Sequence, residues 1–247
     1  MRGIIKVFVI FLFFLGFSPC KSFSQTGYSR LDEPSNILFE LLLYVSFYPI
    51  VGNYYMENHL YNNISDYPFQ SIKKGNYIDS DVSKPKHFRI DIENHFLFSN
   101  EKDYGDHFKI KIRPFHFFYL QSDFFQIIGF NKNKNYPSFS VFNFSFCYDR
   151  LRFQRFDLGW TGGLNYVGNR IQKAGISGGF NMNWFVFQYL SINSSVKWGL
   201  ISKKPVNNFE TQIKFHPKNY FVSIGYETLK AIYVRYHFLS VGIGVYL

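Results

Sequence analysis

Apolar and polar residues alternate along most of the chain with a period of two. In the segment 107–113, for example, Phe108 and Ile110 alternate with Lys109 and Lys111. This period belongs to β-strands, whose successive side chains point to opposite faces. The pattern recurs in these segments: 37–48, 87–99, 107–120, 137–148, 154–167, 174–187, 190–201, 207–216, 219–228 and 231–247. We therefore predict an all-β protein of about ten strands, with eight and twelve as alternatives.

The length and composition of these segments separate two all-β architectures. A soluble sandwich turns its apolar faces inward, whereas a membrane barrel turns them toward lipid and fills its interior with polar groups. The segments contain about ten residues or more, which suits strands that cross a bilayer at a tilt. Their polar faces are rich in Gly, Ser and Asn, and Trp and Tyr recur near segment ends, as in interfacial girdles. The pattern predicts a transmembrane, antiparallel, up-and-down β-barrel.

The connections between the predicted strands suggest a topology. With an even number of strands, both chain ends lie on the periplasmic side, where turns are short, and the longer loops lie outside. Outer loops are then predicted at 49–86, 121–136, 168–173, 202–206 and 229–230, and inner turns at 100–106, 149–153, 188–189 and 217–218. Pro114 falls inside the predicted strand 107–120, where it removes a ladder hydrogen bond. The apolar phase also shifts near His237, which indicates a β-bulge or an extra turn.

The first residues have the composition of a secretory signal. Residues 1–24 combine the basic Arg2 and Lys6 with an apolar run at 7–17, which is too short to cross a bilayer as a helix. Cys20 offers an alternative, as the acceptor of a lipoprotein anchor. The predicted organisation is a cleaved signal peptide at 1–24, a short N-terminal segment at 25–36, and a barrel at 37–247 that carries the long outer loop 49–86.

Composition excludes several classes of function. Of the 247 residues, 22% are aromatic and 18% charged, which excludes a disordered protein. The net charge of +10 does not indicate nucleic-acid binding, because the basic residues alternate with apolar ones. A basic interior or contact with anionic lipopolysaccharide is the expected use of this charge. The seven histidines are scattered without metal-ligand spacing, and no phosphate-binding loop is found, so we predict no metal, cofactor or catalytic residue.

The most specific candidate site is a charged hairpin formed by 87–98 and 107–113. Its charged and histidine residues all have odd numbers, so an antiparallel register with an even index sum places them on one face. The candidate set is Arg89, Asp91, Glu93, His95, Lys109, Lys111 and Arg113. An index sum of 204–206 sets His95 beside Lys109 or Lys111 and Asp91 beside Arg113. We interpret the set as an interior ladder of salt bridges, since charges away from water need partners. A binding site or an acid–base pair is the alternative.

The predicted loop 49–86 is unusually long and aromatic. Loops of this length generally carry a function or a local structure. Its candidate contact residues are Tyr54, Tyr55, His59, Tyr61, Tyr67, Phe69 and Tyr77. Such a density of aromatic side chains suits contact with a protein or a glycan. A lid folded over the barrel mouth is the alternative interpretation.

Three features together resemble the small outer-membrane β-barrel proteins of Bacteroidota and other Gram-negative bacteria. They are the junction Ser24–Gln25, the glycine-bearing strands around 159–163 and 175–179, and the alternating C-terminal strand Ser240–Leu247. The resemblance covers most of the mature chain, although the last residue is Leu247 where such proteins commonly end in Phe. It implies an outer-membrane location. The partners it implies are membrane lipid, lipopolysaccharide, the barrel-insertion machinery and other outer-membrane proteins.

These observations lead to one main functional hypothesis and two alternatives. The main hypothesis is a non-enzymatic barrel, a structural or interaction protein that could serve as a subunit of a larger export or surface complex. The first alternative is a narrow pore or ligand carrier. The second is an outer-membrane enzyme acting on lipid A or peptide, for which His116 follows the lipid-facing phase but has no serine partner that the sequence assigns.

Overall fold

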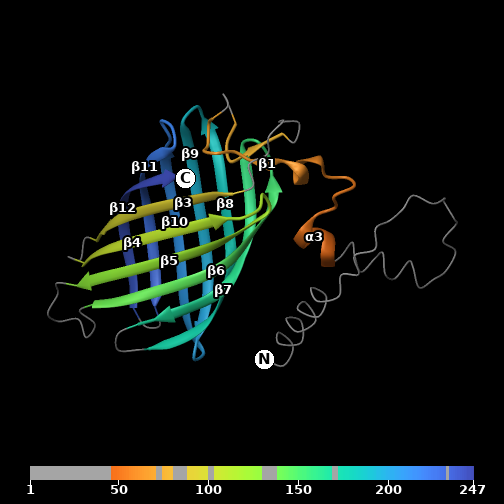
Figure 1. Ribbon diagram of the computed structural model, residues 1–247. Coiled ribbons are helices and arrows are strands. Elements are labelled where there is room, and N and C mark those ends of the chain that lie inside the picture. The colour runs from red at the N-terminus through yellow and green to blue at the C-terminus, as the bar shows by residue number, and fades with distance from the viewer. Residues whose placement is uncertain are drawn as a thin grey trace, which may run out of the picture. The chain divides into compact units, whose positions relative to one another are not determined.

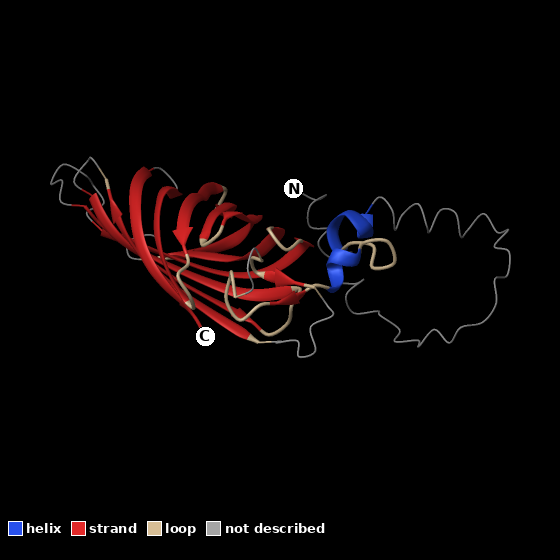
Figure 2. Cartoon of the chain, turned by 90° about the horizontal axis from the view of Figure 1, so that it is seen from above, coloured by secondary structure: helices blue, strands red, loops and turns tan. Residues whose placement is uncertain are grey.

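The computed structural model describes residues 46–70, 74–79, 88–99, 103–129, 138–168, 172–231 and 234–247. Strands dominate this part of the chain (Figure 2). The long strands are β3 (Arg89–Phe98), β4 (Asp103–Arg113), β5 (Phe118–Gly129), β6 (Ser138–Arg152), β7 (Phe156–Val167), β8 (Lys173–Phe187), β9 (Leu190–Ile201), β10 (Lys204–Phe215), β11 (Tyr220–Ala231) and β12 (Val234–Tyr246). Before them come α3 (Tyr48–Val51), the 3₁₀-helix η2 (Asn58–Tyr61), β1 (Asn63–Ile64) and β2 (Tyr77–Ile78). None of the helices among the described residues is long and apolar enough to cross a membrane.

The ten long strands close into a barrel. Each pairs antiparallel with the next one along the chain, and β12 closes the ring by pairing with β3. Figure 1 shows these strands side by side, tilted around the barrel axis. The predicted all-β, antiparallel, up-and-down barrel of about ten strands is thereby confirmed.

Apolar side chains cover the outside of the barrel, and polar side chains lie inside. Ile176 is 65% exposed, Leu239 62% and Ile243 61%, whereas His95 and Lys109 on the alternate face are almost fully buried. Large apolar side chains on all ten strands share the outward position. Exposing apolar surface to water costs about 25 cal/mol per Å². This exterior is therefore suited to contact with lipid rather than with water. The arrangement is that of a transmembrane β-barrel.

The strand boundaries differ from the prediction on either side of Pro114. The predicted strand 107–120 is two strands, β4 and β5, and Pro114 begins the turn between them. Proline has no N–H to give to a ladder, so the strand ends one residue before it. The prediction of an outer loop at 121–136 is wrong for residues 121–129, because these residues belong to β5.

The described part of the first predicted strand is helical. Residues 46–51 of the structure are helical, and 37–45 lie outside the described residues, as do 1–24 and 25–36. The ring of β3–β12 is complete without them. The barrel still has ten strands because the segment 107–120, predicted as one strand, contains parts of two, β4 and β5.

The two ends of the barrel differ, and we name them by what lies there. The cap end carries the start of β3, the C-terminal Leu247 and the turns at 114–117, 153–155, 188–189 and 216–219. The described residues 46–70 and 74–79, which we call the cap, are held there; for example, the Gly75 N–H donates to the Gln154 carbonyl at 2.6 Å. The core end carries the connections β3–β4, β5–β6, β7–β8, β9–β10 and β11–β12. The cap thus precedes the first barrel strand, whereas the sequence predicts a loop between two strands at 49–86.

The apolar phase shift near His237 has a different origin from the predicted bulge. The pairing of β12 with β11 runs without a register shift from Val234 to Val245. Tyr236 and Phe238 are buried inside the barrel, in an apolar cluster at the core end. The inward face of β12 is therefore apolar at the start of the strand. Register shifts occur instead at Asp149/Leu151 and Phe185/Phe187.

Candidate functional site

The interior of the barrel is divided into an apolar part and a polar part. The apolar part fills the core end with Leu97, Phe125, Ile127, Val141, Val167, Ile201, Val206, Leu229, Ala231, Tyr236 and Phe238. The middle and the cap end are lined by buried charged and polar side chains. The two parts meet where the His107 ring stacks on Phe125, with ring centroids 3.7 Å apart.

The seven residues of the predicted charged hairpin all lie in the polar part. Each is at most 8% exposed. The index sum of the β3–β4 register is 202, so His95 pairs with His107 and Glu93 with Lys109. This register is shifted from the predicted sum of 204–206, because β4 begins at Asp103, soon after β3 ends at Phe98. The alternation predicts that these residues share one face of the hairpin. It does not predict which of them lie directly opposite one another.

Ion pairs connect this hairpin to the rest of the barrel wall. Lys109 Nζ lies 2.5 Å from Glu210 Oε1 on β10, and Lys214 Nζ lies 2.5 Å from Glu93 Oε2. Lys111 Nζ is 3.2 Å from Glu93 Oε1. Three further partners missed as site residues are Asp123 and Lys197, which pair with each other, and Glu227. In the sequence, each of these three residues can be recognised as a charged residue at a polar position of its alternating strand.

Near the cap end, arginines organise a second group of carboxylates. The Arg89 guanidinium donates to both oxygens of Asp91, at 2.6 and 3.0 Å, and to the Asn76 side-chain carbonyl of the cap at 3.0 Å. Arg113 donates to Asp149 at 2.9 Å. Because these side chains are buried, each charge depends on its partner for stability. The network therefore joins the cap to the barrel as well as strand to strand.

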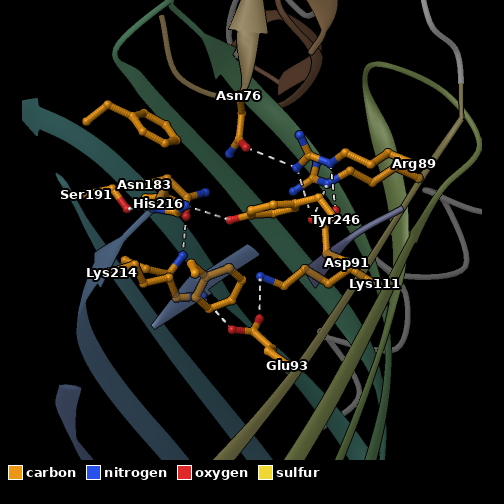
Figure 3. A pocket seen from close by; sticks show the side chains of 14 residues that line it. Asn76, Arg89, Asp91, Glu93, Lys111, Asn183, Ser191, Lys214, His216 and Tyr246 are labelled. Atoms are coloured by element: carbon orange, nitrogen blue, oxygen red, sulfur yellow. Dashed lines mark hydrogen bonds and ion pairs between the residues drawn. The ribbon is translucent and has the colours of Figure 1, made fainter. Parts of the chain in front are cut away.

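A small polar cavity lies between the cap and the ion pairs, lined in part by Glu93, Lys111 and Lys214 (Figure 3). It has room for about one water molecule. On its wall, His216 Nε2 is 2.7 Å from Ser191 Oγ. A serine and a histidine at this distance could act as nucleophile and base. Both are buried, however, and the cavity has no room for an acyl chain or a peptide.

The cap is held to the barrel by charged and polar contacts. Glu57 accepts two hydrogen bonds from the Arg150 guanidinium, at 2.7 and 2.9 Å, and this interaction lowers the pKa of the Glu57 carboxyl. Tyr77 donates to Asp149 Oδ2 at 2.5 Å, and burial raises the pKa of its hydroxyl well above the usual value. His59 stacks on Phe153 at 4.2 Å, and burial lowers its pKa.

The seven candidate contact residues of the predicted loop have different surroundings in the cap. Tyr55 and Tyr61 are exposed, at 95% and 51%. Phe69 and Tyr77 are buried against the barrel. Tyr54, His59 and Tyr67 are half-buried. Of these seven residues, only Tyr55 and Tyr61 are therefore exposed enough to contact a partner while the cap is docked.

Two further residues with reactive side chains are His116, which the sequence pattern singles out, and Cys147. His116 lies in the turn after β4, beside Phe117, with ring centroids 5.1 Å apart. Cys147 is fully buried inside the barrel, with its Sγ 3.2 Å from Thr161 Oγ1. One group of side chains within the described residues has the composition of a metal site, namely His95, His107 and Glu227.

Comparisons with known proteins add little to this geometry. No protein-family model matches the chain, and no curated protein matches it. Among solved structures it is similar to the N-terminal β-barrel domain of Pseudomonas aeruginosa OprF, with 11% identity, a TM-score of 0.34, and coverage of 64% of this chain and 97% of that one. Yersinia pestis Ail is 13% identical, with a TM-score of 0.37 and coverage of 65% of this chain and 99% of that one. Neisserial surface protein A is 14% identical, with a TM-score of 0.35 and coverage of 65% of this chain and 97% of that one.

Scores and identities this low carry no conclusion about function. The barrel is established by its own strand pairing and by its apolar exterior. Its candidate site is the charged interior, with the cap at one end and the apolar cluster at the other.

Proposed function

We propose that this protein is a non-conducting, non-enzymatic barrel of the outer membrane, which acts as a structural and interaction protein. The observation that carries the proposal is the filled interior. Apolar side chains pack the core end, ion pairs occupy the middle, and the cap lies over the other end. A pore or a ligand carrier needs a continuous channel or a cavity of ligand size. The cavity near Lys214, with room for about one water molecule, supplies neither.

The outer-membrane location is supported by the predicted signal peptide at 1–24 together with the barrel fold. In such barrels both chain ends and the short turns lie in the periplasm. We therefore assign the cap end to the periplasm and the core end to the cell exterior. The barrel would contact lipid and lipopolysaccharide through its wall and depend on the barrel-insertion machinery for assembly.

The cap supplies the surface for a protein partner. Tyr55, Met56 and Tyr61 are 95%, 75% and 51% exposed, although the residues around them are docked on the barrel. Exposed aromatic and methionine side chains on an ordered surface are typical of protein interfaces. This surface supports the role of a subunit in a larger outer-membrane complex, with its partner on the periplasmic side.

Conductance in a planar bilayer tests the closed barrel. The purified protein should give no conductance steps, and a general porin added afterwards to the same bilayer should give them. Stable steps from the purified protein would refute the non-conducting barrel. Mass analysis of lipid A from cells with and without the protein should show identical acyl chains, and a lost or added chain would favour an enzyme.

Site-specific photo-crosslinking in cells tests the interaction surface. A photoreactive residue at Tyr55 should give one discrete protein adduct, because that side chain points away from the barrel. The same residue at Leu164, on the lipid-facing wall, is the matched control and should give no such adduct. Identical adducts at both positions, or none at Tyr55, would contradict a partner at the cap.

A further inference from the structure

Two histidines and a glutamate meet in the middle of the barrel interior. His95 on β3 and His107 on β4 are directly paired, and Glu227 reaches them from β11. All three are at most 1% exposed, and their ligand atoms lie within 4.8 Å of one another. Glu227 Oε2 is 2.8 Å from His107 Nδ1, and Glu227 Oε1 is 3.1 Å from His95 Nδ1. One carboxylate thus faces the same nitrogen of both rings.

The second nitrogen of each ring faces another carboxylate. His95 Nε2 is 3.4 Å from Glu93 Oε2, and His107 Nε2 is 3.5 Å from Asp123 Oδ1. A neutral imidazole has one N–H and one lone pair. A neutral His107 would therefore direct a lone pair at a carboxylate oxygen, which is unfavourable, whereas a neutral His95 can accept a hydrogen bond at Nδ1 from the Gln212 amide, 2.6 Å away. Positive charge on the rings or between the two Nδ1 atoms would relieve this contact at His107.

The outer carboxylates resemble the surroundings of metal-bound histidines. A histidine that binds a metal through one nitrogen generally donates its other N–H to a carboxylate, which orients the ring. Glu93 and Asp123 lie on the Nε2 side of the two rings, at 3.4 and 3.5 Å, but neither Nε2 makes a hydrogen bond among the described residues. Glu227 suits the centre, because its ion-pair partners among the described residues are the two histidines rather than a lysine or an arginine.

Buried oxygen atoms without a hydrogen-bond partner lie beside this group. Glu210 Oε2 has none among the described residues and is 3.8 Å from His107 Nδ1. Gln212 Oε1 also has none there, while the Gln212 amide nitrogen is 2.6 Å from His95 Nδ1. Buried polar atoms without partners are uncommon. The position of Glu210 Oε2 beside His107 Nδ1 indicates a ligand that completes the group.

We propose that His95 Nδ1, His107 Nδ1 and the Glu227 carboxylate bind a divalent transition-metal ion, for which Zn²⁺ is the expected occupant. Imidazole nitrogen and carboxylate oxygen are ligands that Zn²⁺ prefers, and four-coordinate sites are usual when its role is structural. Glu210 is positioned to give the fourth ligand through Oε2, while its Oε1 keeps the ion pair with Lys109. The ion would connect β3 and β4 to β10 and β11 inside the barrel.

The lysines around this group already balance its carboxylates. Lys197 pairs with Asp123, Lys214 and Lys111 pair with Glu93, and Lys109 pairs with Glu210. These four lysines balance the four carboxylates Glu93, Asp123, Glu210 and Glu227 when both histidines are neutral. A divalent ion would supply the same added charge as two protons on the rings. Measuring the metal content of the protein therefore distinguishes a bound ion from protons on the rings.

The test is refolding of the full mature chain into detergent with Zn²⁺ or with a chelator. Because the interior is closed at both ends, the ion should enter while the barrel forms. After the chelator has been washed through the folded protein, elemental mass spectrometry should find about one zinc per chain in the first sample. Refolding with Co²⁺ should give the visible absorption of a tetrahedral site. Folded wild-type protein without retained metal and without this absorption would overturn the proposal in favour of two protonated histidines.

Variants locate the ion within the chain. Glu227→Gln and His107→Asn should lose the metal, whereas His237→Asn, on the outer wall, should retain it as the matched control. Asp123→Asn acts on a positioning residue and should lower the zinc affinity by about 10- to 100-fold. Gel migration without boiling reports whether each variant folds, and only folded protein is scored. Retention of full metal content by folded Glu227→Gln and His107→Asn would refute the assignment of the ligands.

Discussion

The polar and apolar parts of the interior fill the same barrel in different ways. At the core end, apolar side chains from most of the strands pack against one another. In the middle and at the cap end, each buried charge has a specific partner, such as Lys109 with Glu210. Apolar packing tolerates many arrangements of similar volume, whereas a buried ion pair needs one partner at one place. The polar part should therefore specify the register of the barrel, and the apolar part should close it.

Of the changes that test this difference, removing a central carboxylate should have the largest effect on stability. Glu93→Ala leaves Lys111 and Lys214 without their acidic partner. Losing one partner of a buried pair costs about 3–5 kcal/mol, so the free energy of unfolding should fall by that amount. Urea unfolding followed by tryptophan fluorescence measures it. Asp106→Ala, which removes an exposed hydrogen bond to Asn94, is the control and should change it by less than about 0.5 kcal/mol.

A truncation at the core end should have the next largest effect. Ile127 is 1% exposed inside the apolar cluster, whereas its neighbour Ile128 is 47% exposed on the outer wall. Ile127→Ala should lower the free energy of unfolding by about 2–3 kcal/mol, because it leaves a cavity in packed surroundings. Ile128→Ala should lower it less, since lipid or detergent can fill the space. Equal losses at the two positions would contradict a packed core end.

Acidification should have the smallest effect, confined to docking of the cap. Burial lowers the pKa of His59, so the undocked segment binds a proton more readily than the docked one. Docking should be strongest above pH 6.5 and weaken as the pH falls below that value. Glu57, whose pKa is lowered by Arg150, adds a second loss only below pH 4.5. Hydrogen exchange of the cap amides measures both steps.

His59→Phe provides the control for this pH dependence. It should preserve the stacking on Phe153 and abolish the change that begins near pH 6.5. The change that belongs to Glu57 should remain. If the variant kept the upper change, another group would be responsible for it.

The alternation along the chain was sufficient to predict which residues point inward. Glu93, Lys109 and Glu210 lie on the polar phase of their strands, and all three are inside the barrel. The alternation was misleading only where the interior is apolar. Near Tyr236 and Phe238 it indicated a bulge, because an inward apolar residue has the same appearance as an outward one. A single-face pattern cannot distinguish lipid from a packed interior, since both favour apolar side chains.

By itself, therefore, the sequence determined the all-β barrel and the orientation of its faces, because each strand meets lipid on one side and the interior on the other, and this contrast is local. The tertiary structure alone decided which charges pair, which end the cap covers, and that His95 and His107 share Glu227. Several of these contacts join residues more than a hundred positions apart, such as His107 and Glu227. They depend on register and on ring closure, which are properties of all the strands together rather than of any one segment.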